Sequence, residues 1–202
     1  MAISNGYATL NEVKAALRIS DAIDDTILEL SIEAASREID GYCERRFYQT
    51  TGTAVYIPQD SFTCEIDDLV TLTSLKTSPD GTGYTQTWTA SDYQFEPLNN
   101  LSGGIPSPYT RIRAVGDYTF PVWEPNNVNA YEATVQVVGT FGWASVPAAI
   151  KQATILLSLR QYRRYDSPLG VAGFDDVSVI RVGRVDPDVQ RLIDPFRKVR
   201  MA

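Results

Sequence analysis

The chain has 202 residues, of which 44% are hydrophobic and 21% charged, as expected for one large domain or a core with an inserted subdomain. Its net charge of −7 argues against a free nucleic-acid binder, which usually carries a basic face. No apolar run approaches the roughly 18 residues of a membrane span, and the N-terminal residues lack a secretory signal, so we expect a soluble, unsecreted protein.

The sequence contains no histidine, which excludes histidine-based catalytic triads, HExxH metal sites and most zinc sites. Cys43 and Cys64 are the two cysteines of the sequence, and they lie on dissimilar segments without a CxxC pair. We therefore expect two buried free thiols rather than a disulfide or a metal site. Catalysis would have to depend on carboxylates alone. We predict no catalytic residue, no cofactor and no metal.

Residues 9–47 have a helical pattern. Thr9 followed by Glu12 predicts a capping box at the start of a short helix. A second, longer helix is expected over residues 22–46. Its apolar residues form two neighbouring rows, one of Ile23, Ile27, Leu30 and Ala34, the other of Leu28, Ile32, Ala35, Ile39 and Tyr42. Two adjacent rows predict a wide apolar face, and hence a helix that is covered on more than one side.

From about residue 50 to residue 143 the hydrophobic period changes to two, and β-branched and aromatic residues become frequent. Residues 78–81 have turn chemistry between two expected strands, 69–76 and 84–89. Prolines and paired glycines punctuate the rest of this region. The pattern predicts a small antiparallel sheet or barrel whose strand order the sequence does not reveal.

The helical pattern returns at Val146 and Pro147, because proline fits the first turn of a helix. This third helix has a wide apolar face and a basic C-terminal end, and a glycine-containing loop follows it. A last helix is expected from Asp186. The predicted fold class is therefore α+β: a helical core of about four helices, residues 1–49 and 145–202, with an antiparallel β-rich insertion, residues 50–144, between the second and third helices.

Two groups of residues are candidates for a binding or catalytic site. Adjacent carboxylates occur at residues 24–25, 67–68 and 175–176, but neighbours in a helix or strand point apart, so a glycosidase pair is not expected. The many aromatic residues of the middle region favour core packing and subunit contacts over a sugar-stacking platform. A carbohydrate-binding module or a histidine-free hydrolase remains as an alternative of another class.

Two stretches of the chain carry a family resemblance. The first comprises residues 7–14, 17–19, 24–25, 30–35 and 39, and the second comprises residues 146–147, 150–153, 160–164, 166–170, 173–174 and 184–189. Together they resemble the head–tail connector (adaptor) proteins of siphophages. The middle region has no counterpart that can be named.

The resemblance implies a structural virion protein rather than an enzyme. It implies a dodecameric ring of this chain in the virion neck, assembled in the host cytoplasm, beneath the portal protein and above the next neck or tail protein, a stopper or tail terminator. DNA would pass through the ring without sequence-specific binding, and no membrane is involved. A neck stopper or tail-completion protein is the alternative within the virion.

The resemblance also nominates candidate site residues. The candidates for docking on the portal lie in the last helix and just after it: Val189, Leu192, Ile193, Phe196 and Arg197. The candidates for a ring or lumen contact lie between the third and the last helix: Asp166, Leu169, Phe174, Asp175 and Asp176.

Overall fold

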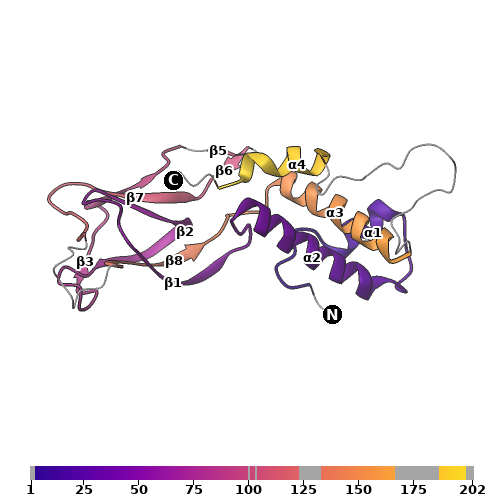
Figure 1. Cartoon of the computed structure of the whole chain (residues 1–202), viewed down its shortest axis with the longest axis horizontal. Coiled ribbons are helices and arrows are strands. Elements are labelled where there is room, and N and C mark those ends of the chain that lie inside the picture. Colours follow the sequence, from indigo (N-terminus) through magenta and orange to yellow (C-terminus); the bar gives the residue numbers. More distant parts are fainter. Residues whose placement is uncertain (1–2, 100, 103, 123–132, 167–186, 199–202) are drawn as a thin grey trace. The chain divides into compact units, whose positions relative to one another are not determined.

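The computed structural model describes residues 3–99, 101–102, 104–122, 133–166 and 187–198. The chain divides into two compact units. One unit, Met1–Phe47 with Val146–Ala202, is helical, and the other, Tyr48–Ser145, contains the strands. The predicted α+β class, with a β-rich region between the second and third helices, is confirmed (Figure 1).

The helical unit begins with α1 (Leu10–Leu17), and the predicted capping box is present. Thr9 Oγ1 accepts from the Glu12 amide at 3.3 Å, and Glu12 Oε2 accepts from the Thr9 amide at 2.8 Å. The second helix, α2 (Asp25–Cys43), is shorter than the predicted 22–46. At its start, Asp21 Oδ1 accepts from the Ile23 amide and holds a turn before the helix. At its end, Glu44 adopts a left-handed conformation, which stops the helix.

The two apolar rows of α2 have different surroundings. Leu28, Ile32 and Ile39, from the second row, are fully buried. In the first row, by contrast, Ile23 is 86% exposed and Leu30 is 43% exposed. Within the described part of this single chain only the second row is therefore covered, because a helical period identifies apolar rows but does not say what covers them.

The C-terminal part of the helical unit comprises α3 (Ala148–Asp166), α4 (Pro187–Ile193) and a short 3-10 helix, η1 (Asp194–Phe196). The helix α3 contacts α1, α2 and α4, so it lies at the centre of the unit. Ile155, Leu159 and Tyr162 of α3 pack against the buried side chains Val13 and Leu28. The core of the unit is thus formed by residues from both ends of the chain.

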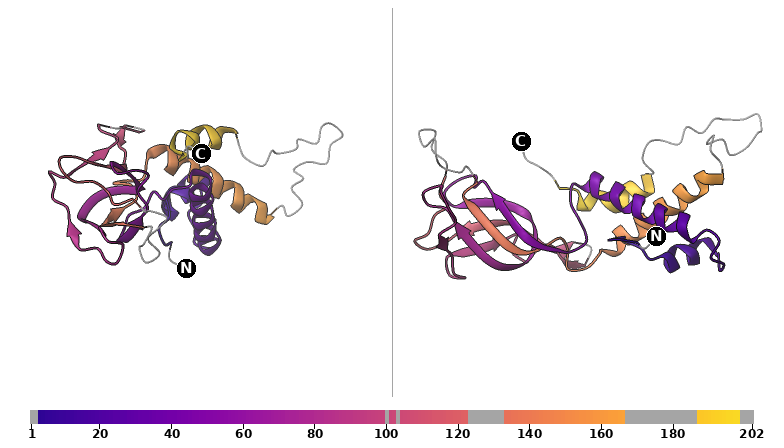
Figure 2. Two further views of the ribbon diagram at one scale, coloured as in Figure 1. Left: turned by 60° about the vertical axis from the view of Figure 1, so that its left-hand side comes forward. Right: turned by 90° about the horizontal axis from the view of Figure 1, so that it is seen from below.

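The strand unit contains an antiparallel sheet, seen from two further sides in Figure 2. The order of its strands is β1-β8-β2-β7-β4, with β3 also paired to β2. Its strands are β1 (Thr50–Tyr56), β2 (Thr63–Thr77), β3 (Gln86–Thr87), β4 (Tyr93–Glu96), β7 (Tyr109–Ala114) and β8 (Val135–Phe141). A separate hairpin pairs β5 (Leu101–Ser102) with β6 (Ile105–Pro106).

The long strand β2 organises the sheet. Its first part, from Thr63 to Leu69, pairs with β7, and its second part, from Leu69 to Thr77, pairs with β8. Register shifts on both sides, the mark of β-bulges, bend the strand and increase its twist. The inward side chains of β2, β7 and β8 are buried in one core: Cys64, Ile66, Leu69, Leu75, Ile112, Val135 and Val137.

Candidate interaction surfaces of the helical unit

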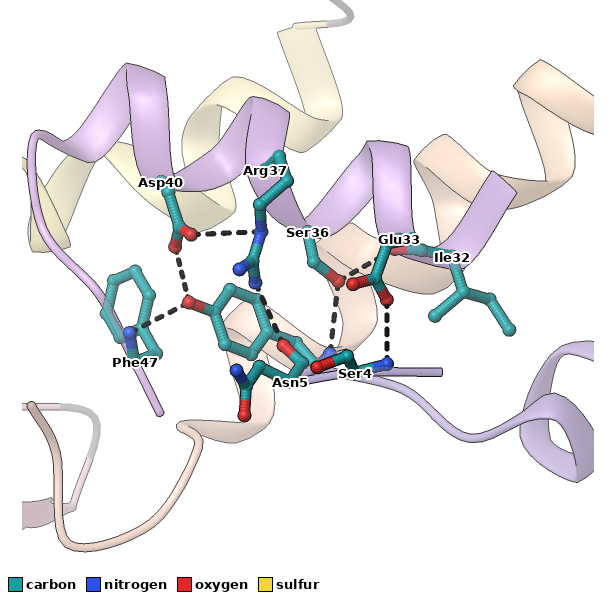
Figure 3. A network of polar contacts seen from close by, with 9 residues as sticks. Ser4, Asn5, Ile32, Glu33, Ser36, Arg37, Asp40 and Phe47 are labelled. Atoms are coloured by element: carbon teal, nitrogen blue, oxygen red, sulfur yellow. Dashed lines mark hydrogen bonds and ion pairs between the residues drawn. The ribbon is translucent and has the colours of Figure 1, made fainter. Parts of the chain in front are cut away.

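The N-terminal segment is fixed to α2 through Tyr7, which is 2% exposed. The Tyr7 hydroxyl donates to Asp40 Oδ1 and accepts from the Phe47 amide, the latter at 2.9 Å (Figure 3). The Arg37 guanidinium lies 5.6 Å from the centre of the Tyr7 ring, and Arg37 Nε lies 3.2 Å from Asp40 Oδ2. One buried side chain therefore joins the N-terminal segment, α2 and the chain that leaves α2.

Further hydrogen bonds continue this attachment along α2 (Figure 3). The Ser4 amide donates to Glu33 Oε2 at 3.2 Å, and the Tyr7 amide donates to Ser36 Oγ at 3.1 Å. Arg37 Nη2 donates to the Asn5 carbonyl at 2.9 Å. Burial raises the pKa of the Asp40 carboxyl above its ordinary value, and it also raises the pKa of the Tyr7 hydroxyl. The arrangement is one of structural attachment, since its polar groups bond to one another.

The C-terminal segment, which carries the predicted portal-docking residues, packs on the end of α2. Val189, Ile193 and Phe196 are only 1–3% exposed. The Phe196 ring meets the Phe47 ring edge-on at 5.8 Å, and the Lys198 amide donates to the Cys43 carbonyl at 2.9 Å. These three docking candidates therefore hold their own segment on the helical unit in this conformation.

The other two docking candidates are more accessible. Leu192 is half-buried and Arg197 is exposed. The Arg197 guanidinium lies 5.7 Å from the centre of the Tyr42 ring, and the Tyr42 hydroxyl donates to Asp194 and accepts from Gln190 Nε2. The outer side of the segment is thus a polar surface with side chains of both charges. The docking assignment stays a prediction.

The predicted ring or lumen candidates lie almost entirely outside the part of the chain that the structure describes. Leu169, Phe174, Asp175 and Asp176 are outside it, and Asp166 is the last residue of α3. The nearby Arg163 and Arg164 are exposed. Their assignment also stays a prediction.

The carboxylate pairs of the described residues have structural surroundings. Asp24 accepts from the Tyr162 hydroxyl at 2.6 Å, and Asp25 accepts from Lys14 Nζ at 2.6 Å. In β2, Asp67 is exposed and Asp68 is buried, so the two side chains lie on opposite faces. Within the described ranges no three acidic or cysteine side chains are grouped to hold a metal ion. In the same ranges no helix is long and apolar enough to cross a membrane.

The aromatic residues of the strand unit pack together, as predicted. The Trp88 and Phe120 rings stack at 4.7 Å and are both buried, and Trp88 Nε1 donates to Thr77 Oγ1 at 2.9 Å. Phe95 and Tyr109 stack at 4.8 Å and are half-buried. Among the described residues, these stacked rings are core elements rather than an open platform for sugars.

The combination of a capped helical pair and a sheet also occurs in known proteins. The family model described as phage gp6-like head-tail connector protein matches residues 7–76, which contain α1, α2, β1 and nearly all of β2. The predicted resemblance to head–tail connector proteins is confirmed. No curated protein sequence matches the chain significantly.

Two solved structures share the fold of this connector-like chain. A chain from the neck of an empty GTA particle, computed with C6 symmetry, is 18% identical, with a TM-score of 0.59. A chain from the virion of a native gene transfer agent (GTA) particle is 19% identical, with a TM-score of 0.51. Each match covers 100% of this chain and 95% of the other chain. The likeness thus includes the strand unit, which the family model covers only in part.

Sequence reasoning missed the contacts that fix the two ends of the chain to α2. Tyr7 entered the prediction only as part of the family resemblance, and Asp40 did not enter it. The spacing of Arg37 and Asp40, three residues apart, is the one local signal, since such residues are neighbours on a helix. The partnership of Tyr7 with Asp40 spans 33 residues and has no periodic signature.

Proposed function

We propose that this chain is a structural connector of the neck of a phage-like particle, where it joins the head to the tail. The observation that carries the proposal is the match of residues 7–76 to the head–tail connector model. The full-length fold likeness to a chain from a GTA neck supports it. The contacts described in the helical unit hold its own segments together. The proposal includes no catalytic activity.

In this proposal copies of the chain form a ring in which one patch of each copy meets a different patch of the next. The neck of the empty GTA particle was computed with C6 symmetry, and the dodecameric ring implied by the sequence resemblance is compatible with that symmetry. DNA passes through the ring. The net charge of −7 favours passage without tight binding, because like charges repel the phosphate backbone.

The proposed partners are the portal protein on one side and the next neck or tail protein on the other. The C-terminal segment is the proposed portal contact, with Leu192 and Arg197 on its accessible side. Val189, Ile193 and Phe196 keep the segment folded in the free chain, and they reach a partner directly if the segment detaches on docking. Many weak contacts around a ring add up through effective concentration, so each copy needs only a modest affinity.

The test is to mix the full chain with purified portal rings and to image the product by electron microscopy. We expect a second ring on the portal, with its copy number read from class averages. A Leu192→Glu, Arg197→Glu variant should lose this binding, whereas Leu98→Glu, a change at an exposed leucine of the strand unit, should retain it. A wild-type chain that neither binds the portal nor forms rings would contradict the proposed function.

A further inference from the structure

The helix α2 carries a second apolar face that the described residues leave uncovered. This face, called here the α2 stripe, consists of Ile27, Leu30 and Ala34 of α2 together with Ile23, which lies in the turn just before the helix. Ile23 is 86% exposed, Leu30 is 43% exposed, Ala34 is exposed and Ile27 is half-buried. The stripe lies away from the side of α2 that buries Leu28, Ile32 and Ile39.

The spacing of the stripe identifies the kind of partner that it fits. Its three helical members, Ile27, Leu30 and Ala34, follow one another at intervals of three and four residues. This alternation is the seam along which one helix packs against another. Single exposed apolar residues are normal on a protein surface, but a row in helical register is typical of an interaction site. The expected occupant is therefore a helix.

The charges beside the stripe indicate which helix. From Asp25 to Cys43, α2 has five acidic residues and one basic residue: Asp25, Glu29, Glu33, Glu38, Asp40 and, as the base, Arg37. Asp25 and Asp40 have cationic neighbours in Lys14 and Arg37. Glu33 and Glu38, in the described residues, accept from uncharged donors, the Ser4 amide and Gln161 Nε2. The α2 surface is thus acidic. Packing it against the same stripe of another copy would bring like charges together, which opposes association.

The chain carries a complementary basic surface on α3. This helix has four basic residues and one acidic residue: Lys151, Arg160, Arg163, Arg164 and, as the acid, Asp166. Three members, Leu156, Arg160 and Arg163, follow one another at intervals of four and three residues and are half-buried or exposed. They are called here the α3 face. It offers one apolar side chain and two cations in the register that the α2 stripe requires.

We propose that the α2 stripe of one copy receives the α3 face of a second copy of this chain. This inference rests on the proposed function, because the contact joins two different surfaces, as the closing of a ring requires. Apolar packing of the stripe against Leu156 supplies the attraction, and Arg160 and Arg163 facing the acidic side of α2 fix which surface is chosen.

The test uses single cysteines introduced into the full-length chain. Cys43 and Cys64 are both buried, and burial raises the pKa of each thiol to about 12, so the native thiols react slowly. We would mix a Leu30→Cys chain with an Arg160→Cys chain, add a short bismaleimide, and measure dimers on a denaturing gel. Both positions are central in their surfaces, so the expected crosslink does not depend on the direction in which the helices run.

The expected result is efficient crosslinking of the mixture and only background crosslinking of either chain alone. A mixture of Leu98→Cys with Arg160→Cys is the matched control, because Leu98 is an equally apolar, 60% exposed residue of the strand unit. Crosslinking no stronger than in this control would overturn the inference. Efficient crosslinking of Leu30→Cys alone would also overturn it, because the α2 stripes of two copies would then pack against each other.

A second variant separates this inference from the proposed function. Leu30→Glu changes an exposed side chain, so the fold should survive, as circular dichroism can confirm. It should weaken association of the copies by about ten-fold or more, since the loss of a central apolar contact costs over 1 kcal/mol at many interfaces. Rings of normal abundance with Leu30→Glu would refute the interface and leave the connector function standing. A wild-type chain that neither binds the portal nor forms rings would refute both.

Discussion

Each of the two units of the chain is stabilised internally in a different way. In the strand unit, neighbouring strands pair along their length, and β2 alone contacts β3, β7 and β8 through backbone hydrogen bonds. In the helical unit, side chains join segments that are far apart in the sequence: Tyr7 bonds to Asp40 of α2, and Phe196 contacts Phe47, which lies just after α2. The strand unit should therefore be most sensitive to backbone crowding, and the helical unit to the loss of single side chains.

The largest expected effect tests the strand unit. Gly139 of β8 pairs with Gly52 of β1. The two positions differ in the room that they leave for a side chain. A Cβ atom on Gly139 would lie 2.3 Å from the Thr71 carbonyl oxygen, whereas one on Gly52 would meet nothing within 4 Å. Gly139→Ala should lower the free energy of unfolding by about 3 kcal/mol, because the backbone of β2 must move.

Gly52→Ala is the control for this change, and it should alter stability by no more than about 0.5 kcal/mol. Urea unfolding followed by tryptophan fluorescence measures both, since Trp88 and Trp143 lie in the strand unit. Equal effects of the two substitutions would show that crowding does not limit this sheet.

An intermediate effect tests the helical unit. Phe196→Ala removes a buried ring that contacts Phe47, and it should lower the stability of the unit by about 3 kcal/mol. Arg197→Ala, at the exposed neighbour, should have little effect. The readout is the rate at which a thiol reagent labels Cys43, which lies against the Ile193 carbonyl beneath this segment.

In the Phe196→Ala variant Cys43 should be labelled faster, while Cys64, buried in the strand unit, should stay protected. Labelling of both thiols at the same increased rate would mean that the two units unfold together. The comparison between the units would then fail.

The smallest expected effect is a pair of opposite pH dependences within the helical unit. The pKa of Asp40 is raised above 3.8, chiefly by burial. The contribution of Asp40 to folding stability is therefore fully present below pH 3.8, and it is lost as pH rises through the pKa of the folded state. The pKa of Glu12 is lowered from 4.5, chiefly by its hydrogen bond from the Thr9 amide and then by Lys151. Its contribution is present above pH 4.5 and is lost as pH falls.

Thermal unfolding across the acid range measures both contributions as differences from the wild type. Relative to wild type, Asp40→Asn should gain in stability as pH rises through the window above 3.8. Glu12→Gln should lose in stability, relative to wild type, as pH rises through the window below 4.5. Parallel curves for the two variants would contradict the assigned surroundings of these carboxyls.

Local patterns allowed part of this fold to be predicted. The capping box at Thr9 and the buried row of α2 depend on residues three or four apart, and both were found as expected. The exposed row of α2 could not be recognised, because the period of Ile23, Ile27 and Leu30 is the same whether a helix of this chain or of another copy covers it. Sequence patterns report faces, and only packing reports their partners.

Long-range pairing was beyond local patterns. The strand β2 was expected only from residue 69, because the buried Asp68 interrupts the apolar alternation. The sheet order places β8 between β1 and β2, which no spacing in the sequence specifies. In the candidate site, the family resemblance pointed to the C-terminal segment, but the segment that carries Val189, Ile193 and Phe196 packs on α3 and meets the end of α2, which lies about 150 residues earlier in the chain.

The helical unit is assembled from both ends of the chain, and the whole strand unit lies between these two parts in the sequence. During synthesis α2 emerges long before α3, so Leu28 and Ile32 can pack against Val13 of α1 but not against α3 until the strand unit has been made. A nascent chain that stops before α3 therefore cannot complete the core of the helical unit. A truncated product would lack the α3 face as well as the core, so we expect it to be excluded from the proposed ring. In the proposed assembly, the order of the elements along the chain would then select for complete chains.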